Sequence, residues 1–215
     1  MHTLTPLSAG QLPFDRSWFL HVNAFARDTP WLHEPARVWA QYGVVVFAAL
    51  LLWSWWSARA RRDVRAVAAA LWAPIGTLLA VGLNQLVGGS VDEARPYAVL
   101  PHVLVLVSRT SDFSFPSDHA VMAGSVAAGV FVANRRLGVV AAVAALAMCL
   151  VRVYVGAHFP GDVIAGAAFG ALVTLAGWFL LRRVLVRLVE ALAGTPLRVF
   201  VTAGPAPAPG QLDAS

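Results

Sequence analysis

The sequence contains no lysine, a single cysteine and few charged side chains of either sign. Charged residues make up 13% of its 215 residues, about half the share of a typical soluble domain, whereas hydrophobic residues make up 59%. Such a chain lacks the polar side chains needed to cover a water-facing surface, which excludes an ordinary soluble domain. The single cysteine, Cys149, excludes an intramolecular disulfide.

Because lysine is absent, all 16 basic residues are arginines, and the formal net charge is +5. A basic chain can indicate nucleic-acid binding, but these arginines cluster at the ends of apolar runs, which is typical of membrane proteins. We therefore expect the bilayer as a partner of this chain, and no nucleic acid. Residues 1–15 lack the basic start, apolar core and cleavage site of a signal peptide, so the apolar runs themselves are expected to direct insertion.

Five apolar segments reach or approach the roughly 20 residues that a membrane-spanning helix needs. Residues 14–27 precede them, are too polar to span, and are expected to form a helix in the membrane interface or packed on the bundle. The expected fold class is an all-α integral membrane protein, with one domain at residues 1–202 and a disordered tail at 203–215. The segments run from about residue 38 to 57, 66 to 87, 119 to 133, 137 to 154 and 163 to 181, the third being short.

Arginine-rich loops follow the first, third and fifth apolar segments. Positively charged loops remain in the cytoplasm, and five spans place all three loops on that side. We therefore expect a multi-pass protein of the cell membrane with an extracytoplasmic N-terminus and a cytoplasmic C-terminus. Residues 88–118 and 155–162 then lie on the outer side, and both carry concentrated ionisable groups.

Three short segments bring two arginines, two histidines, a serine and an aspartate to this outer side. Arginine offers planar forks of donors that bind phosphate oxygens in pairs, which suits Arg95 and Arg152 to an anion site. Ser117 follows a proline and precedes an apolar helix, so we expect it at the N-cap, with its hydroxyl and the adjacent N–H groups directed at an anion. The segments are Glu93–Tyr97, Ser114–His119 and Arg152–Asp162.

The two histidines have complementary expected roles. His158 can attack phosphorus if a carboxylate holds its far nitrogen, and Asp162 has the four-residue spacing for this if a helical turn joins the two. His119 then protonates the leaving oxygen and later takes a proton from water. No cluster of cysteine, histidine and carboxylate side chains calls for a metal, and no cofactor is expected.

The three segments resemble the signature of the type 2 phosphatidic acid phosphatase superfamily. That signature reads Lys, six residues and Arg-Pro; then Pro-Ser-Gly-His; then Ser-Arg, five residues, His, three residues and Asp. The matching positions, at the same spacings, are Arg95-Pro96, Pro116-Ser117, His119, Arg152, His158 and Asp162. The departures are Gly88 in place of Lys, Asp118 in place of Gly and Val151 in place of Ser.

The resemblance implies a lipid phosphatase in which His158 is the nucleophile and forms a phosphohistidine, His119 is the acid and base, and Asp162 orients His158. It also implies a phosphate site formed by Arg95, Arg152 and Ser117, to which we add the adjacent Asp118 as a candidate. The second and third segments look like the bacterial undecaprenyl pyrophosphatase branch, which implies hydrolysis of a polyprenyl diphosphate to the monophosphate.

Two alternative functions stay open at this point. The first is a phosphatidate or phosphatidylglycerophosphate phosphatase with the same chemistry. The second is a non-catalytic lipid-phosphate binding or carrier protein, for which Gly88 is the only hint. Arg109 is expected either to belong to a solvated loop or to help bind a second phosphate. Asn84 and Gln85 are expected either to make interhelical hydrogen bonds or to face the substrate, and Gly166 and Gly170 to allow close packing.

Overall fold

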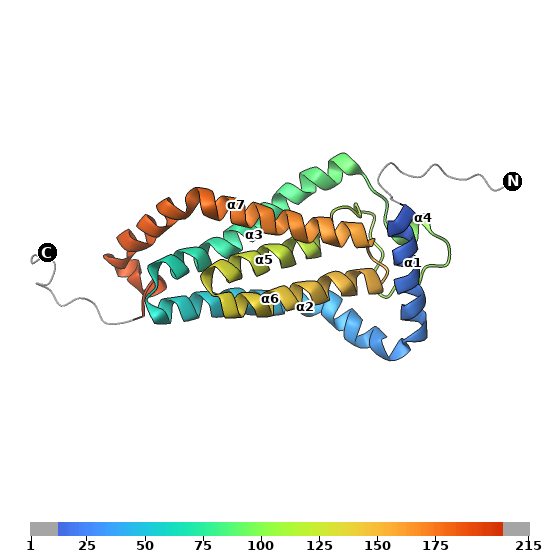
Figure 1. Cartoon of the computed structure of the whole chain (residues 1–215), viewed down its shortest axis with the longest axis horizontal. Coiled ribbons are helices and arrows are strands. Elements are labelled where there is room, and N and C mark those ends of the chain that lie inside the picture. Colours follow the sequence, from blue (N-terminus) through green and yellow to red (C-terminus); the bar gives the residue numbers. More distant parts are fainter. Residues whose placement is uncertain (1–12, 204–215) are drawn as a thin grey trace, which may run out of the picture.

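The structure is a computed structural model that describes residues 13–203, and every regular element in that part is a helix. Five long helices form an elongated bundle, and a sixth lies across one end of it (Figure 1). The helices are α1 (Pro13–Asp28), α2 (His33–Arg61), α3 (Val64–Val91), the short α4 (Pro96–Val99), α5 (Asp118–Ala133), α6 (Arg135–Tyr154) and α7 (Pro160–Ala193), with 3-10 helices at Pro30–Leu32 and Pro196–Phe200. The predicted all-α class is confirmed. Nearly all of the predicted tail, residues 204–215, lies outside the described part.

Within the described residues, α2, α3, α6 and α7 are long and apolar enough to cross a membrane. Helix α5 has 16 residues, about 24 Å at 1.5 Å per residue, and is shorter than the roughly 30 Å hydrocarbon core of a bilayer. The third predicted segment is therefore short, as expected. The other four bundle helices all contact α5, so the shortest helix is the central one.

The long helices extend past the predicted apolar limits. Helix α7 continues from residue 181 to Ala193, since no glycine or proline interrupts the chain until Gly194. Helix α2 ends where Arg62 adopts a left-handed backbone with φ of 55°, and Asp63 then caps α3 by accepting the Ala66 N–H at 3.0 Å. Hydropathy marks the lipid-facing part of a helix, whereas breakers and caps mark its ends.

Close contact between α5 and α7 depends on glycine. A Cβ atom added to Gly170 would lie 2.1 Å from the carbonyl oxygen of Val121, and one added to Gly166 would lie 2.8 Å from that of Ser117. No side chain fits at either distance, so the prediction that these glycines allow close packing is confirmed. This contact sets the start of α7 directly against the start of α5.

The sides of the bundle are apolar and exposed. Leu78 on α3 is 75% exposed and Leu180 on α7 is 81% exposed, among many other large apolar side chains. A water-facing surface of this kind would be a strong aggregation site, whereas the acyl chains of a bilayer cover it naturally. The multi-pass membrane protein expected from composition is therefore the structure observed.

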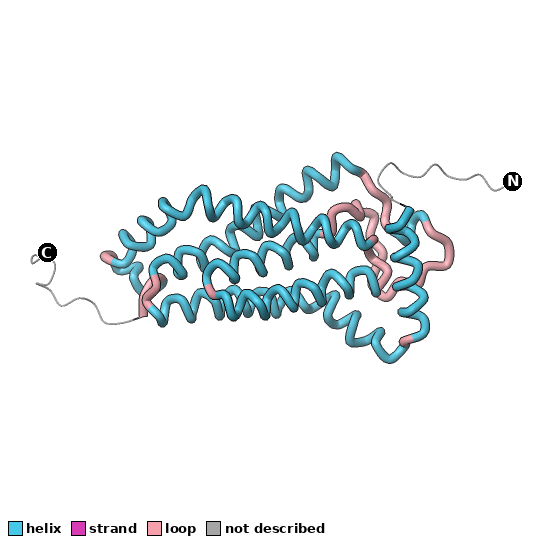
Figure 2. Tube along the Cα trace, in the orientation of Figure 1, coloured by secondary structure: helices cyan, strands magenta, loops and turns pink. Residues whose placement is uncertain are grey.

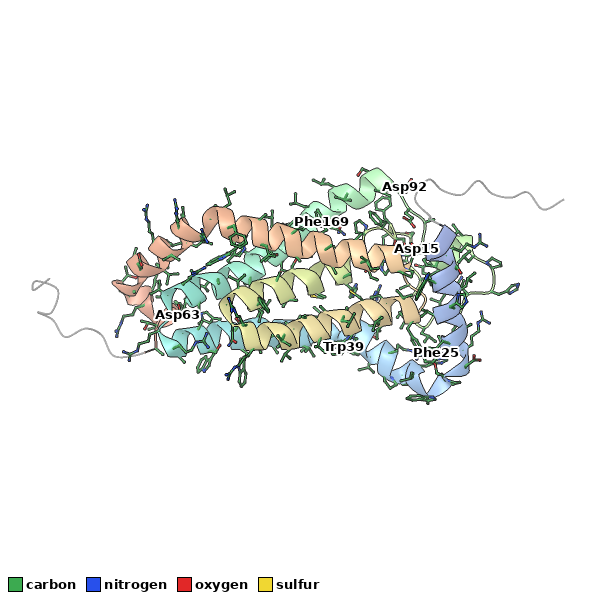
Figure 3. The ribbon with its side chains drawn as sticks, viewed as in Figure 1. Asp15, Phe25, Trp39, Asp63, Asp92 and Phe169 are labelled. Carbon is green, nitrogen blue, oxygen red and sulfur yellow. The ribbon has the colours of Figure 1, made fainter. Side chains whose placement is uncertain are left out.

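Helix α1 and the longer loops gather at one end of the bundle (Figure 2). Asp15 and Asp92 mark this end, and Asp63 marks the opposite end (Figure 3). Phe19 packs edge-on against Phe159 with ring centroids 5.3 Å apart. The predicted N-terminal helix thus exists and packs on the bundle, where it supports the loops described next.

Candidate active site

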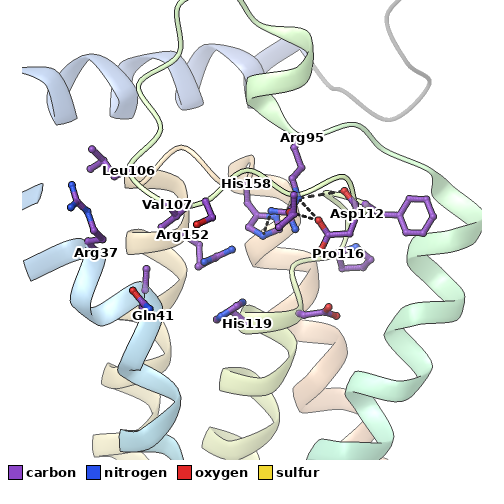
Figure 4. Close-up of a pocket in the computed structure, with 15 residues that line it drawn as sticks. Arg37, Gln41, Arg95, Leu106, Val107, Asp112, Pro116, His119, Arg152 and His158 are labelled. Carbon is purple, nitrogen blue, oxygen red and sulfur yellow. Dashed lines mark hydrogen bonds and ion pairs between the residues drawn. The ribbon is translucent and has the colours of Figure 1, made fainter. Parts of the chain in front are cut away.

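A cavity of about 520 Å³ opens at the end of the bundle near α1 (Figure 4). Its volume is in the range of small-molecule sites. Five of the seven predicted site residues line it, and the other two, Ser117 and Asp162, are buried beside it with exposures of 0% and 1%. The structure therefore brings the three sequence segments together. The five lining residues are Arg95, Asp118, His119, Arg152 and His158.

The hydrogen bonds of His158 define which ring nitrogen carries the proton. Its Nδ1 lies 2.9 Å from the carbonyl oxygen of Ser114 and 3.3 Å from Oδ2 of Asp162, and both of these atoms can only accept. Nδ1 must therefore carry the hydrogen, which leaves the lone pair on Nε2. Nε2 lies 3.1 Å from Nη1 of Arg95, which donates to it. This tautomer presents an unprotonated nitrogen next to the cavity, as a nucleophile requires.

Asp162 reaches His158 across the start of α7, so the contact does not need the helical turn on which the four-residue spacing was made conditional. His158 precedes the N-cap residue Phe159, and α7 begins after it. Oδ2 of Asp162 accepts from the Phe159 N–H at 2.9 Å and from the Ser114 hydroxyl at 2.5 Å. The carboxylate is thereby fixed from two sides before it meets the imidazole.

Ser114 is a site residue that the sequence reasoning missed. It is fully buried, its hydroxyl donates to Asp162, and its carbonyl accepts from His158. Its backbone N–H also donates to the carbonyl of Glu93 at 2.8 Å, which ties the first segment to the second. The only available signal was its place at the start of the second segment, two residues before Pro116.

Burial lowers the pKa of His158, and the hydrogen bond to Asp162 opposes this by raising it. The positive charges of Arg152 and Arg95 lower the pKa further. The net direction is downward from the ordinary value of 6.5, so the imidazole is neutral at neutral pH. The same positive charges would stabilise an anionic group placed against Nε2.

The two arginines differ in how they are held. Arg95 donates to Oδ1 of Asp112 at 3.0 Å and to the carbonyl of Ala157 at 3.1 Å, besides its contact with His158. Arg152 is 8% exposed, and its side chain makes no hydrogen bond or ion pair with any residue in the described part. Keeping an unpaired charge buried costs several kcal/mol. An anion in the cavity would remove that cost.

The start of α5 forms the floor of the cavity. His119 faces the cavity and has no hydrogen-bond partner among residues 13–203, so it is free to act on a bound group. Ser117 occupies the predicted N-cap position, but its buried hydroxyl makes no capping bond and has no partner in the described part. The first N–H groups of a helix have no intrahelical acceptor and favour an anion.

The side chain of Asp118 points toward α3 and is not placed to bind phosphate directly. Its Oδ1 accepts from Nδ2 of Asn84 at 2.7 Å and from Nε2 of Gln85 at 2.9 Å. Asn84 and Gln85 therefore make interhelical hydrogen bonds, which was one of the two roles expected for them. A carboxylate cannot donate to phosphate, so only the backbone N–H of Asp118 is suited to that task.

Arg109 is exposed and does not line the cavity, so of its two expected roles the structure favours the solvated loop over binding of a second phosphate. Its guanidinium lies 5.5 Å from the ring centre of Tyr97. The cavity wall opposite Arg95 comes instead from α2, with Arg37 and Gln41.

Across residues 13–203, no group of three or more histidine, cysteine and acidic side chains is placed to hold a metal ion. Metal independence stays a prediction.

Asp15 of α1 braces the start of α7. It is 6% exposed, and its Oδ1 accepts the Gly161 N–H at 2.8 Å, next to Asp162. Burial raises the pKa of Asp15, the bond to Gly161 lowers it, and the charge of Asp162 raises it again. The net direction is upward from the ordinary value near 3.8.

We expect Asp15→Asn to raise the thermal midpoint in detergent at pH 8 by about 2–4 °C, the shift expected for about 1 kcal/mol in a chain of this size. A carboxyl with a raised pKa holds its proton to higher pH when folded, so its contribution to stability falls as pH rises from near 3.8 through the folded pKa. Asparagine keeps the acceptor and removes that loss. Asp15→Ala, which leaves the Gly161 N–H unpaired, should lower the midpoint at both pH 5 and pH 8. Equal losses for both variants at pH 8 would show that the charge itself stabilises the fold.

Comparison with known proteins agrees with this geometry. A sequence profile described as the PAP2 superfamily matches residues 69–185, more than half of the chain. The bacitracin transport permease protein BcrC of Bacillus licheniformis is 31% identical over 157 residues, which is 73% of this chain and 75% of that protein. The undecaprenyl-diphosphatase BcrC of Bacillus subtilis (strain 168) is 30% identical and covers 58% of this chain and 62% of its own length.

A solved structure shares the fold. The crystal structure of a transmembrane PAP2 type phosphatidylglycerolphosphate phosphatase from Bacillus subtilis superposes with a TM-score of 0.59 and 19% identity, over 81% of this chain and 89% of that one. At this identity the likeness concerns the helical architecture alone. The profile match over residues 69–185 and the relative that is 31% identical over 73% of the chain show that this chain belongs to the PAP2 superfamily.

Proposed function

We propose that this membrane lipid phosphatase hydrolyses a polyprenyl diphosphate to the monophosphate through a phosphohistidine on His158. One observation carries the proposal: Arg152, a buried arginine whose side chain has no partner among residues 13–203, shares a cavity with the unprotonated Nε2 of His158. The buried charge of Arg152 requires an anion, and Nε2 of His158 supplies a nucleophile. A lipid carrier that leaves its cargo unchanged does not need a nucleophilic nitrogen in its cavity.

The first step forms the phosphohistidine. The Nε2 lone pair attacks the terminal phosphorus, the bond from phosphorus to the bridging oxygen breaks, and the lipid monophosphate leaves with that bond's electron pair. Arg95 gives up its hydrogen bond to Nε2 and turns it to a phosphate oxygen. The imidazole becomes positively charged, and Asp162 stabilises it through Nδ1–H.

The second step regenerates the free enzyme. Water attacks the phosphorus of the phosphohistidine, the nitrogen–phosphorus bond breaks, and inorganic phosphate is released. In the first step, His119 supplies a proton to the leaving oxygen if the leaving group needs one. In the second step, His119, which faces the cavity, takes a proton from the attacking water. The positive charge on His158 disappears as Nε2 regains its lone pair.

The choice of lipid rests on two supports. One relative is named undecaprenyl-diphosphatase BcrC, and the second and third segments look like that branch. The protein of similar fold from Bacillus subtilis is a phosphatidylglycerolphosphate phosphatase, which keeps a glycerophospholipid phosphatase as the second candidate. A diphosphate has the better leaving group, since the departing phosphate carries negative charge more readily than a lipid alkoxide.

We expect a higher kcat/KM for a polyprenyl diphosphate than for phosphatidate or phosphatidylglycerophosphate in matched detergent micelles. Release of inorganic phosphate measures this, and the ratio reports transition-state discrimination directly. A polyprenyl monophosphate controls for burial of the tail. Faster turnover of either glycerophospholipid would replace the proposed substrate. Binding of lipid phosphates without phosphate release from any of them would support the carrier alternative.

We also propose that the cavity faces the extracytoplasmic side and that the C-terminus is cytoplasmic. The end of the bundle opposite the cavity carries Arg65, Arg182, Arg183 and Arg187 around one hollow, beside Glu190. Such a concentration of arginine is typical of the cytoplasmic side. The recycled lipid carrier would then be dephosphorylated on the face where it delivers its cargo.

Thiol labelling in intact cells tests this orientation. In a Cys149→Ala background, a cysteine at the exposed Ser90 should react with an impermeant thiol reagent, because Ser90 lies at the cavity end of α3. A cysteine at the exposed Arg62, at the other end of the bundle, should react only after the cells are permeabilised. Labelling of the second position alone in intact cells would reverse the orientation and leave the chemistry untouched.

A further inference from the structure

We infer that the cavity holds a second phosphate site, formed by Arg37 and Gln41 of α2, for the phosphate that stays on the lipid. The inference rests on the proposed function and adds to it the groups that select a diphosphate. Both residues line the same cavity as His158, His119 and Arg152. They lie outside residues 69–185, so they are not part of the segment that carries the superfamily match.

The placement of α2 makes two sites in one cavity possible. In Figure 4, Arg37 and Gln41 stand on one side of the cavity, Arg95 and Asp112 stand on the other, and Arg152 and His119 lie between them. A volume of about 520 Å³ is far more than a single phosphate group fills. A terminal phosphate held against His158 therefore leaves room toward α2.

The charge of Arg37 is available to a ligand. Its one ion pair among the described residues is with Glu34 at 2.8 Å, one helical turn earlier, and the two side chains are 44% and 71% exposed. Exposed pairs of this kind contribute little, so a phosphate can replace the carboxylate readily. Arg95, by contrast, is already committed to Asp112, Ala157 and His158.

A diphosphate carries more charge than the first site neutralises. Arg152 is the one cavity arginine in the described part that has no partner, and Asp112 offsets part of the charge of Arg95. The motif cation expected at position 88 is absent, because that residue is glycine and packs against Phe113. Arg37 thus supplies a third cation from a different helix, and its planar fork suits two oxygens of one phosphate.

The competing candidate is Arg109, which carries the same charge on the same side of the bundle. It stacks on Tyr97 and does not line the cavity. It is therefore the matched control: replacing either residue removes one positive charge, but only Arg37 is in contact with the ligand space. A general attraction of anionic lipids would be weakened equally by both substitutions.

The test compares Arg37→Gln with Arg109→Gln on two substrates that share a tail, a polyprenyl diphosphate and the polyprenyl monophosphate. Arg37→Gln should lower the diphosphate-to-monophosphate ratio of kcat/KM by about 10- to 100-fold, the loss expected for charge-assisted hydrogen bonds to one phosphate. Arg109→Gln should change that ratio by less than about twofold, in line with surface substitutions. Arg37→Lys, which keeps the charge but not the fork, should fall between wild type and Arg37→Gln.

Inhibition provides an independent readout. Inorganic pyrophosphate and orthophosphate are compared as competitive inhibitors of aryl phosphate hydrolysis, a reaction that needs only the first site. Arg37→Gln should weaken pyrophosphate by about 10-fold or more and orthophosphate by much less. Glu34→Gln serves as a further control, since it frees Arg37 and should not weaken pyrophosphate. A loss with Glu34→Gln equal to that with Arg37→Gln would show that the ion pair only supports the fold, and would overturn the inference.

The failure of the inference is distinct from that of the proposed function. If the wild type prefers the diphosphate and Arg37→Gln leaves the ratio unchanged, or Arg109→Gln lowers it equally, the second site is elsewhere and the proposed function stands. If the wild type prefers the monophosphate or a glycerophospholipid, the proposed substrate is wrong and the inference falls with it. The ratio falling only for Arg37 variants supports both.

Discussion

Replacing His158 with alanine is expected to abolish both turnover and covalent labelling by a substrate radiolabelled in its terminal phosphate. The nucleophile itself is removed, and losses on the order of 10⁴-fold or more are typical for such a deletion. Acid quenching would destroy a phosphohistidine, so the label should be trapped in denaturing alkali and followed on a gel. The wild type should carry label in the steady state or in a brief pulse.

His21→Ala is the matched control for this experiment. His21 is an exposed histidine of α1 whose Nδ1 contacts the carbonyl of Ser17, away from the cavity. Its removal should leave labelling and turnover within about twofold of wild type. Label that persists in His158→Ala would place the nucleophile on another residue. Asp162→Asn should retain a weak label, because the Ser114 carbonyl still fixes the Nδ1–H tautomer.

The same histidine sets the acid limb of the pH profile. Burial and the two neighbouring arginines lower the pKa of His158 below 6.5. Protonation of Nε2 removes the nucleophilic lone pair, so kcat/KM should fall as pH drops through a value below 6.5 and stay level between that value and neutral pH. The sign follows from the depressed pKa of a base: the active, neutral form persists to lower pH than in a free imidazole.

The sequence predicts much of this site because its chemistry is concentrated in short segments with fixed spacing. Once the arginine-rich loops place three segments on one membrane face, Arg95, His119 and His158 have to meet at the end of one bundle. Apolar composition likewise leads to an all-helical membrane protein, since helices satisfy their own backbone hydrogen bonds in lipid. Both predictions depend on local patterns. The all-helical fold is confirmed, and the structure places five of the predicted site residues around one cavity.

Local sequence patterns do not predict contacts between segments that are distant in the sequence. Ser114 meets Asp162 across 48 positions of sequence, and nothing in either segment signals the pairing. In the sequence, Arg37 looks like an ordinary exposed helical arginine paired with Glu34, and only the structure shows that it lines the cavity. No helical turn joins His158 to Asp162, because Pro160 begins α7 and His158 lies in the preceding loop.

The orientation of Asp118 shows how a departure from a motif can be absorbed by a neighbouring helix. The residue stands where the superfamily signature has glycine, and a carboxylate at an anion site should repel the ligand. The side-chain amides of Asn84 and Gln85 on α3 both donate to Oδ1 of Asp118, at 2.7 and 2.9 Å. The carboxylate is thus held against α3 by neutral donors, and the adjacent His119 remains free to face the cavity.

Replacing His119 with alanine is expected to lower kcat/KM by about 10²- to 10⁴-fold, the range for loss of a positioned acid and base. The size of the loss should depend on the leaving group. An alkyl phosphate expels a strongly basic oxygen that needs a proton, whereas an activated aryl phosphate expels a weakly basic one. The loss should therefore be largest for phosphatidate, smaller for a lipid diphosphate and smallest for the aryl phosphate, measured as phosphate release under single-turnover conditions.

Equal losses on all three substrates would mean that His119 does not protonate the leaving group. His119→Ala should still accumulate labelled His158 with the aryl substrate, since formation of the phosphohistidine then needs no acid while its hydrolysis by water lacks the base. The two cavity variants should also move substrate preference in opposite directions. His119→Ala raises the preference for a diphosphate over a phosphomonoester, because the monoester depends more on the acid, whereas Arg37→Gln lowers it by removing the second phosphate site. Opposite shifts from two residues that line one cavity would separate leaving-group chemistry from phosphate binding.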